Sequence, residues 1–252
     1  MDAGPEYLDR SGRPRLAYRH VAGTGPTIVF LPGYMSDMAG GKATAVFDWA
    51  AAEGRACLLL DYAGCGLSDG LFADQALLDW RGDVLDLIDA RAAGPVIIVG
   101  SSMGGWLMLL TALALIQRDG PGRVAGLVGI AAAPDFTDWG FSDTEKAIIL
   151  AEGELREETT YSDQPYVTTR GFFQSGEANR LLDTVIPLTC PVRLLHGQED
   201  GDVPPEISLR LAAAIASDDV QVTLVKGGDH RLSRETDIAL LIDTVARLAT
   251  AN

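Results

Sequence analysis

The stretch V-I-I-V-G-S-S-M-G-G-W at residues 96–106 decides the fold of this chain. Its four leading residues are apolar and mostly β-branched, which predicts a strand buried inside a sheet. The apolar run that begins at Trp106 predicts a helix. Between them stands the motif G-x-S-x-G, centred on Ser102. A strand, a sharp turn and a helix are the setting in which this motif holds a serine hydroxyl exposed above a sheet.

The glycines of the motif identify which of two adjacent serines lies at its centre. A turn this tight strains its central residue and leaves almost no room for side chains two positions away. Gly100 and Gly104 meet this condition for Ser102. Centring the motif on Ser101 would need a glycine where Val99 stands. We therefore predict that Ser102 is the nucleophile.

Length and charge restrict the class of protein. A chain of 252 residues with 47% hydrophobic and 22% charged residues suits one α/β domain over residues 1–252. Lys and Arg total 20 while Asp and Glu total 35, so the net charge is −15. A surface this acidic repels nucleic acid and anionic lipid, and we expect neither as a partner.

Cysteine usage and the start of the chain favour a cytoplasmic location. The three cysteines, Cys57, Cys65 and Cys190, are odd in number and lack C-x-x-C spacing. Cys57 and Cys190 lie next to apolar strand-like runs, so we expect both to be buried, unpaired thiols in a reducing compartment. Residues 1–10 are polar and acidic, without the apolar core of a signal peptide. No apolar run approaches the roughly 18 residues that a membrane-spanning helix needs, so we expect no stable membrane insertion.

Strand-like and helix-like segments alternate along the chain. We expect strands at residues 15–21, 27–31, 57–62, 96–99, 124–130, 192–196 and 220–225, with residues 7–9 pairing with the first. We expect helices at residues 41–52, 74–93, 205–216 and 233–251, besides the one that follows Ser102. This alternation predicts a mostly parallel sheet with helices on both faces.

Residues 135–190 interrupt the alternation with a segment far longer than a usual crossover. We expect two helices in it, near residues 143–158 and 171–183, separated by a polar break at residues 161–165. It carries seven aromatic residues. The segment is either an elaborated crossover packed on the sheet or a small helical lid whose apolar face selects the substrate, and we favour the lid.

A serine nucleophile needs a base, and the chain has three histidines. His20 lies in an early strand before the nucleophile, and His196 ends a buried strand, where we expect a hydrogen bond in the following turn. His230 lies on a loop between the last strand and the last helix, at the sheet edge that also presents Ser102. A base must transfer a proton from the nucleophile to the leaving group, and a loop allows the movement that this requires. We therefore predict that His230 is the base.

The base needs a carboxylate to orient its ring and stabilise its charged form. Asp200 follows the penultimate strand, and Asp135, which follows the strand before it, is the second choice because both keep the order serine, acid, histidine. Asp229 is adjacent to His230 and is expected to point elsewhere. We favour Asp200 and interpret Asp202 and Glu199 as exposed turn residues.

Attack on a carbonyl places negative charge on its oxygen, which preorganised N–H donors must stabilise. The amide of Met103, next to the nucleophile, is one expected donor. The second is expected from the loop after the strand at residues 27–31, where Pro32 and Gly33 turn the chain back over the site. We assign it to the amide of Tyr34.

These motifs together resemble the α/β-hydrolase superfamily, and within it the mitochondrial palmitoyl-protein thioesterases that also act as mycophenolic acid acyl-glucuronide esterases. The resemblance rests on F-L-P-G-Y-M-S at residues 30–36, D-Y-A-G-C-G-L-S-D-G at 61–70, V-G-S-S-M-G-G-W-L-M at 99–108, C-P-V-R-L-L-H-G at 190–197 with Asp200 and V-P at 203–204, and D-H-R at 229–231. It implies triad roles for Ser102, Asp200 and His230. The animal members carry a targeting leader that we do not find here, and residues 135–191 match least.

The resulting hypothesis is a serine hydrolase that cleaves acyl esters or thioesters, of small molecules or of S-acylated proteins, through an acyl-enzyme and without metal or cofactor. An aminopeptidase or C–C bond hydrolase could use the same triad, and a non-catalytic ligand-binding protein could keep the scaffold. The resemblance also implies acyl glucuronides, whose carboxylate would need a cation. Arg231, beside His230, is the candidate, and a surface arginine without this role is equally compatible.

Overall fold

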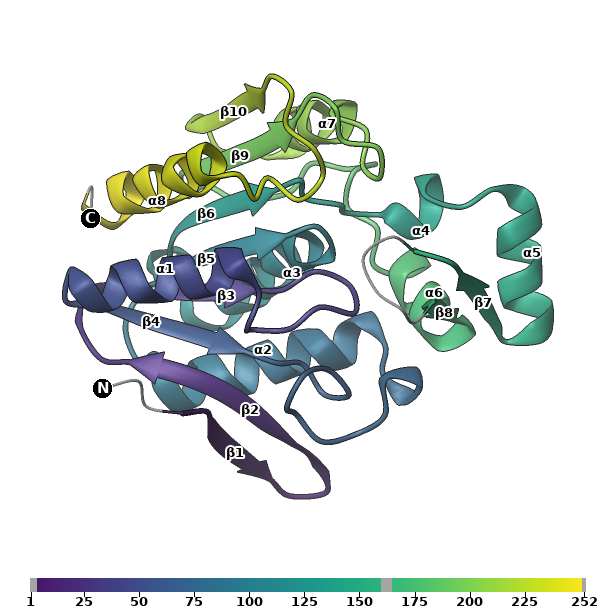
Figure 1. Ribbon diagram of the computed structural model, residues 1–252, viewed down its shortest axis with the longest axis horizontal. Coiled ribbons are helices and arrows are strands. Elements are labelled where there is room, and N and C mark those ends of the chain that lie inside the picture. The colour runs from purple at the N-terminus through teal and green to yellow at the C-terminus, as the bar shows by residue number, and fades with distance from the viewer. Residues whose placement is uncertain (1–3, 160–164, 251–252) are drawn as a thin grey trace.

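A computed structural model describes residues 4–159 and 165–250. Its centre is an eight-stranded sheet in the order β1-β2-β4-β3-β5-β6-β9-β10, in which β1 and β2 run antiparallel to their neighbours and the remaining strands are parallel (Figure 1). The strands are β1 Glu6–Arg10, β2 Arg13–Val21, β3 Thr24–Leu31, β4 Arg55–Leu60, β5 Val96–Ser101, β6 Val124–Ile130, β9 Val192–Gly197 and β10 Val220–Val225. The predicted mostly parallel sheet is confirmed, and so is the predicted pairing of the first two strands.

The strand that leads to Ser102 lies in the middle of the sheet. β5 pairs with β3 on one side and β6 on the other, and its residues from Val96 to Val99 are fully buried. Because side chains alternate along a strand, Val96 and Ile98 join one hydrophobic core while Ile97 and Val99 join the other. Each buried side chain of this size contributes about 1.5–3 kcal/mol, so β5 anchors the elbow from both faces of the sheet.

Helices cover both faces of the sheet, as the alternation predicts. α1 and α8 pack on one face, and α2, α3 and α7 pack on the other (Figure 1). Their bounds are α1 Gly41–Ala52, α2 Leu77–Arg91, α3 Met103–Asp119, α7 Glu206–Ala214 and α8 Glu235–Thr250, and short 3-10 turns lie at Phe72–Asp74 and Pro121–Arg123. All carboxyl ends of the parallel strands therefore meet at one edge, where the expected site residues follow β3, β5, β9 and β10.

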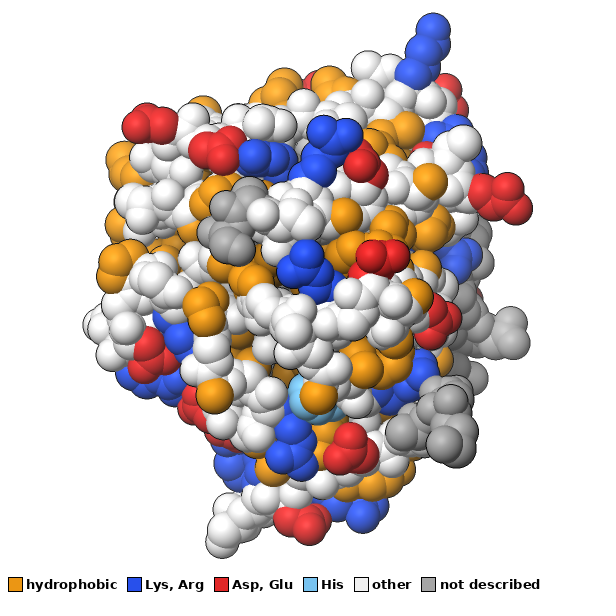
Figure 2. All heavy atoms as spheres, turned by 90° about the vertical axis from the view of Figure 1, so that its left-hand side faces the viewer, with side chains coloured by type: hydrophobic (Ala, Val, Ile, Leu, Met, Phe, Trp, Pro, Cys, Tyr) orange, Lys and Arg blue, Asp and Glu red, His pale blue; other side chains and the backbone are white. Residues whose placement is uncertain are grey.

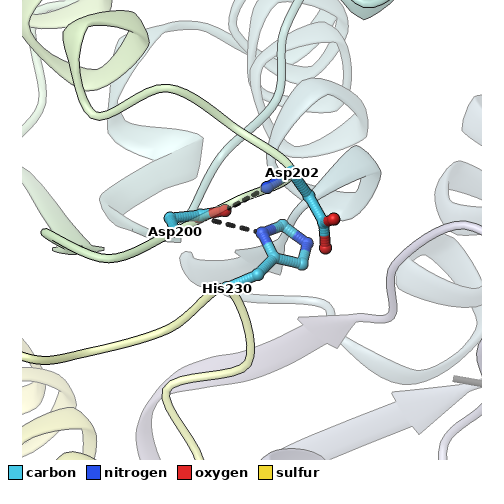
Figure 3. Close-up of side chains that lie close together, drawn as sticks. All are labelled: Asp200, Asp202 and His230. Atoms are coloured by element: carbon cyan, nitrogen blue, oxygen red, sulfur yellow. Dashed lines mark hydrogen bonds and ion pairs between the residues drawn. The ribbon is translucent and has the colours of Figure 1, made fainter. Parts of the chain in front are cut away.

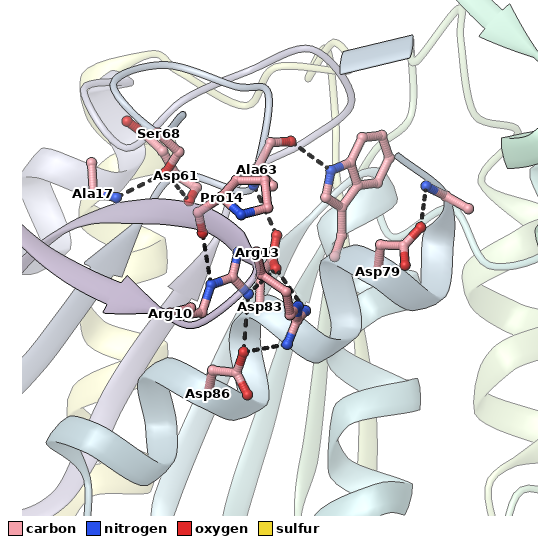
Figure 4. A network of polar contacts seen from close by, with 12 residues as sticks. Arg10, Arg13, Pro14, Ala17, Asp61, Ala63, Ser68, Asp79, Asp83 and Asp86 are labelled. Atoms are coloured by element: carbon pink, nitrogen blue, oxygen red, sulfur yellow. Dashed lines mark hydrogen bonds and ion pairs between the residues drawn. The ribbon is translucent and has the colours of Figure 1, made fainter. Parts of the chain in front are cut away.

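A buried ionic network fixes the loop after β4 (Figure 4). Asp83 of α2 accepts hydrogen bonds from Arg10 Nη1 at 2.6 Å and, through its other oxygen, from the Ala63 amide at 2.8 Å. Arg13, in the same hairpin as Arg10, pairs with Asp86 at 2.6 Å. The antiparallel hairpin, α2 and the loop are thus held together, and the loop in turn supports the site.

The segment between β6 and β9 lies at the end of the sheet away from both termini (Figure 1). It contains α4 Phe136–Trp139, α5 Asp143–Glu152, β7 Glu154–Glu157, β8 Tyr166–Thr169 and α6 Arg170–Glu177. The segment holds helices, as expected, but β7, where the helix expected at residues 143–158 would continue, pairs with β8 in a two-stranded antiparallel sheet. The expected break at residues 161–165 falls mostly outside the described residues.

Local chemistry explains this difference. α5 begins at a capping box formed by Ser142 and Glu145. Gly153, at a φ of 97°, ends the helix at Glu152, six residues before the expected end. β8 is rich in β-branched residues, and the side chain of Thr169 caps α6 by accepting from the Phe172 amide at 3.1 Å. These are ordinary start and stop signals that the helical periodicity concealed.

Thiols and surface charge agree with the composition. Cys57 and Cys190 are buried and unpaired, as expected, and so is Cys65. Burial raises the pKa of the Cys57 and Cys65 thiols to about 12. Figure 2 shows the side at the left of Figure 1, where acidic and basic side chains are interspersed among hydrophobic and uncharged ones. Within the part of the chain that the structure describes, no helix is long and apolar enough to cross a membrane.

Candidate active site

The elbow between β5 and α3 has the geometry that its glycines predict. Ser102 has a φ of 55° and a ψ of −121°, a strained conformation for a residue with a side chain. A Cβ on Gly100 would lie 2.3 Å from Gly104 O, and a Cβ on Gly104 would lie 2.2 Å from Leu31 O. Ser101, by contrast, is still part of β5 and pairs with Ile130. The turn therefore presents Ser102 and requires glycine at both flanking positions.

Ser102, His230 and Asp200 form one hydrogen-bonded chain. His230 Nε2 lies 3.2 Å from Ser102 Oγ. The other ring nitrogen, His230 Nδ1, lies 2.9 Å from Asp200 Oδ2 (Figure 3). The two loops that carry the histidine and the acid touch backbone to backbone, since a Cβ on Gly197 would lie 2.3 Å from Gly228 O. The structure thus brings together three residues that are separated by up to 128 positions in the chain.

The carboxylate of Asp200 is buried and well supplied with donors. Its Oδ1 accepts from the amides of Asp202 at 2.9 Å and Val203 at 2.8 Å. Burial alone would raise the pKa of this carboxyl, but hydrogen bonds from His196, His230 and the Val203 amide together hold it well below its usual range. Asp200 is therefore ionised whenever the protein is folded near neutral pH, as the partner of an imidazolium must be.

The other acids have different partners. Asp135 is buried, and its carboxylate accepts from the amides of Leu181 and Leu182 at 2.7–2.9 Å, so it organises the chain after α6. Asp229 accepts from the Leu232 amide at 3.0 Å. Asp202 is exposed, as expected, but lies beside His230, and one ligand atom of each of Asp200, Asp202 and His230 lies within 4.8 Å of the others (Figure 3).

The loop after β3, which carries Tyr34, passes close to Ser102. A Cβ on Gly33 would lie 3.4 Å from Ser102 Cβ, and Met35 has a φ of 50°. The loop is held from the β4 side, where the Tyr62 hydroxyl donates to Pro32 O at 3.0 Å and Asp61 accepts from the Met38 amide at 2.7 Å. The Met103 amide opens α3, where the first N–H groups have no partner within their own helix.

The ring of Tyr34 connects this loop to the segment between β6 and β9, which is called the insert from here on. This connection is not among the expectations drawn from the sequence. Its hydroxyl donates to Val167 O of β8 at 2.6 Å, and burial raises the pKa of the phenol above its usual range. The ring also contacts five aromatic side chains at centroid distances of 5.0–6.1 Å, namely Phe72, Trp80, Phe136, Tyr166 and Phe172. The insert and the loop are therefore one packed unit.

Ser102 and His230 line a cavity of about 790 Å³, a size typical of small-molecule sites. The insert forms an aromatic wall of this cavity with Phe136, Trp139, Phe141 and Tyr166. The described residues of this segment, 135–159 and 165–190, therefore lie over the carboxyl ends of the strands, where a lid is expected. A second cavity, of about 560 Å³, lies far from Ser102, among residues such as Pro26, Pro95 and Pro191 at the amino ends of the strands.

Charged side chains of both signs line the main cavity. Arg231 is exposed at its edge, and its carbonyl accepts a hydrogen bond from Lys42 Nζ, which also lines the cavity. Burial and then the charge of Arg231 lower the pKa of Lys42 to about 8. Asp37, Glu157 and Asp202 contribute negative charge. Lys42 is not among the site residues predicted from the sequence, because it belongs to no motif that would indicate a functional role.

A serine at a strand–turn–helix elbow above a mostly parallel sheet defines an α/β hydrolase, and the chain belongs to the α/β hydrolase family, whose model matches residues 28–244. It is 43% identical over 248 residues to mitochondrial palmitoyl-protein thioesterase ABHD10 of Mus musculus, covering 96% of this chain and 82% of that protein. The human protein of the same name is 40% identical over 243 residues, covering 95% and 78%.

Solved structures agree. Alpha/beta hydrolase domain-containing protein 10 from mouse superposes with a TM-score of 0.89 at 42% identity and covers 98% of both chains. A protein from Agrobacterium vitis described as a hydrolase superposes with a TM-score of 0.91 at 37% identity, covering 97% of this chain and 98% of that one. The family resemblance inferred from the motifs is thus confirmed.

The assignment of the acid is tested by three matched substitutions. Asp200→Asn should lower kcat by several orders of magnitude, since an amide would favour the wrong tautomer of His230. Asp202→Asn and Asp135→Asn should keep kcat within about tenfold of wild type. Steady-state hydrolysis of a p-nitrophenyl ester measures all three. Equal losses at Asp135 and Asp200 would contradict the assignment.

Proposed function

We propose that this α/β hydrolase is a serine hydrolase that cleaves acyl esters or thioesters through an acyl-enzyme. The observation that carries the proposal is the hydrogen-bonded chain from Ser102 through His230 to the buried Asp200, at the wall of a cavity. The arrangement supplies a nucleophile, a base and an orienting carboxylate. The names of the relatives, palmitoyl-protein thioesterases, support the substrate class.

The geometry supports a specific sequence of steps. His230 Nε2 takes the proton of Ser102 as Oγ attacks the acyl carbonyl, and the amides of Met103 and Tyr34 stabilise the oxyanion. The imidazolium, held by Asp200, then donates its proton to the departing thiol or alcohol. Water repeats the sequence and releases the acid. Each step uses residues of this chain and needs no metal or organic cofactor.

The aromatic wall supports an acyl chain as the bound group. Phe136, Trp139, Phe141 and Tyr166 provide apolar area on the insert, and burial of an aliphatic chain contributes about 0.8 kcal/mol per methylene. The thiol or alcohol would leave past the charged edge around Arg231. S-acylated proteins and small acyl esters or thioesters fit this arrangement equally. A cytoplasmic location stays a prediction, since the named relatives are mitochondrial.

Two serine variants test the function. Ser102→Ala should reduce hydrolysis of acyl esters and thioesters to near background, because the carbonyl loses its nucleophile, whereas Ser101→Ala should retain most activity. A panel of p-nitrophenyl esters, acyl thioesters, aminoacyl amides and C–C substrates measures the class. Turnover of the amide or C–C substrates alone would favour an aminopeptidase or C–C hydrolase, and a wild-type protein inactive on the whole panel would favour a non-catalytic scaffold.

Arg231 and Lys42 give the site a further expected property, selection for an anionic leaving group. Arg231→Ala should raise KM for a carboxylate-bearing ester much more than for a neutral ester of the same acyl group, because only the first loses an ion pair. In the wild type, KM for the anionic ester should also rise as the pH passes about 8, where Lys42 loses its charge. A uniform rise in KM for both esters would instead indicate a disturbed His230.

A further inference from the structure

The carboxylate of Asp200 faces two imidazole rings. Its Oδ2 lies 2.9 Å from His230 Nδ1 and 3.1 Å from His196 Nε2. The side chains of His196 and Asp200 are both completely buried, so water replaces neither contact. His196 lies near the end of β9, opposite Leu224 of β10, and four residues before the acid. Asp200, the acid of the proposed triad, therefore interacts with both His230 and His196.

The partners of His196 determine its protonation. Nε2 also lies 2.9 Å from Val203 O, so this nitrogen faces two oxygens that can only accept, and it must carry a hydrogen. Nδ1 lies 2.7 Å from the hydroxyl of Ser208 in α7, which is fully buried and can donate to it. Every polar atom of the ring is thus satisfied in the neutral form, and Nε2–H is a fixed donor to Asp200.

We propose that His196 is a positioning residue for the reaction, which fixes the Asp200 carboxylate and shares its negative charge with His230. The proposal rests on the proposed function and adds a residue that does not contact the reacting atoms. Two amides already hold Oδ1 of Asp200, and His196 supplies the second donor to Oδ2. Both oxygens are therefore held by N–H groups, and the carboxylate cannot rotate away from His230 without losing one of them.

Loss of the His196 donor has a predictable direction. Oδ2 would then direct its charge to His230 alone and hold the protonated imidazole more strongly, which moves the acid limb of the activity profile to higher pH. The carboxylate would also gain freedom to rotate, so kcat should fall while substrate binding is unchanged. Other charged groups near Asp200 and His230 include Asp202, Asp229, Arg231 and Lys42. A substitution at His196 leaves all four of these side chains unchanged.

Two amide substitutions isolate the contact. In His196→Asn the amide can replace Nδ1 and still reach Ser208, but it ends short of Asp200. In His196→Gln the amide nitrogen can take the place of Nε2 and donate to Asp200 and Val203 O. Both side chains are polar and close in size to histidine, and the two variants divide its contacts: asparagine keeps the one to Ser208, and glutamine keeps the donor to Asp200. Leu211→Ala, buried one turn further along α7, is the control for lost stability.

The profile of kcat/KM against pH, measured on a neutral p-nitrophenyl ester, decides the proposal. His196→Asn should lower kcat about tenfold or more, with KM within about twofold, and should move the acid limb upward by at least about half a pH unit. His196→Gln should restore both values, and Leu211→Ala should lower only the melting temperature. An acid limb that stays in place or moves downward in His196→Asn, or equal losses in both amide variants, overturns the proposal. Full activity of Ser102→Ala would instead overturn the proposed function.

Discussion

The close approach of three backbone segments around Ser102 is the constraint on which the site depends. Gly104 lets the start of α3 touch the end of β3, and Gly100 lets β5 touch α3, both at distances that a side chain would forbid. The resulting strain is held by β5, which is buried in both cores of the protein. The same contact brings the loop that carries Tyr34 next to Ser102, so the elbow and the loop proposed to stabilise the oxyanion form as one unit.

A second layer of buried contacts supports each group of the site. Asp61 and Tyr62 hold the loop after β3, and Asp83 holds the loop that carries them. The ring of Tyr34 joins that loop to the insert through Val167. On the other side, His196 and two amides hold Asp200. The site residues that lie on loops are therefore held firmly in position, because side chains from helices and strands fix each loop.

Much of this arrangement could be predicted from the sequence. Buried strands and the G-x-S-x-G motif specify the sheet and the elbow, and the order of strand ends brings His230 and Asp200 to Ser102 without any knowledge of contacts. The pairing of β7 with β8 is not predicted, because β7 lies inside the helix-like pattern of residues 143–158 and the β-branched run of β8 is only four residues long. The place of Lys42 at the cavity could not be predicted, since it depends on a contact with the distant Arg231. The contact of His196 with Asp200 spans only four residues, but it depends on how the turn after β9 folds back, which the sequence pattern does not specify.

The central claim is that Ser102 is an activated nucleophile, and covalent labelling tests it most directly. A fluorophosphonate reacts with a serine only where a base and oxyanion donors activate it. Intact-mass measurement should show the addition of one phosphonyl group, and peptide mapping should place it on Ser102. Labelling should slow sharply in His230→Ala, because the hydroxyl then keeps its proton. A folded protein that takes up no phosphonyl group, or takes it up on Ser101, would contradict the account.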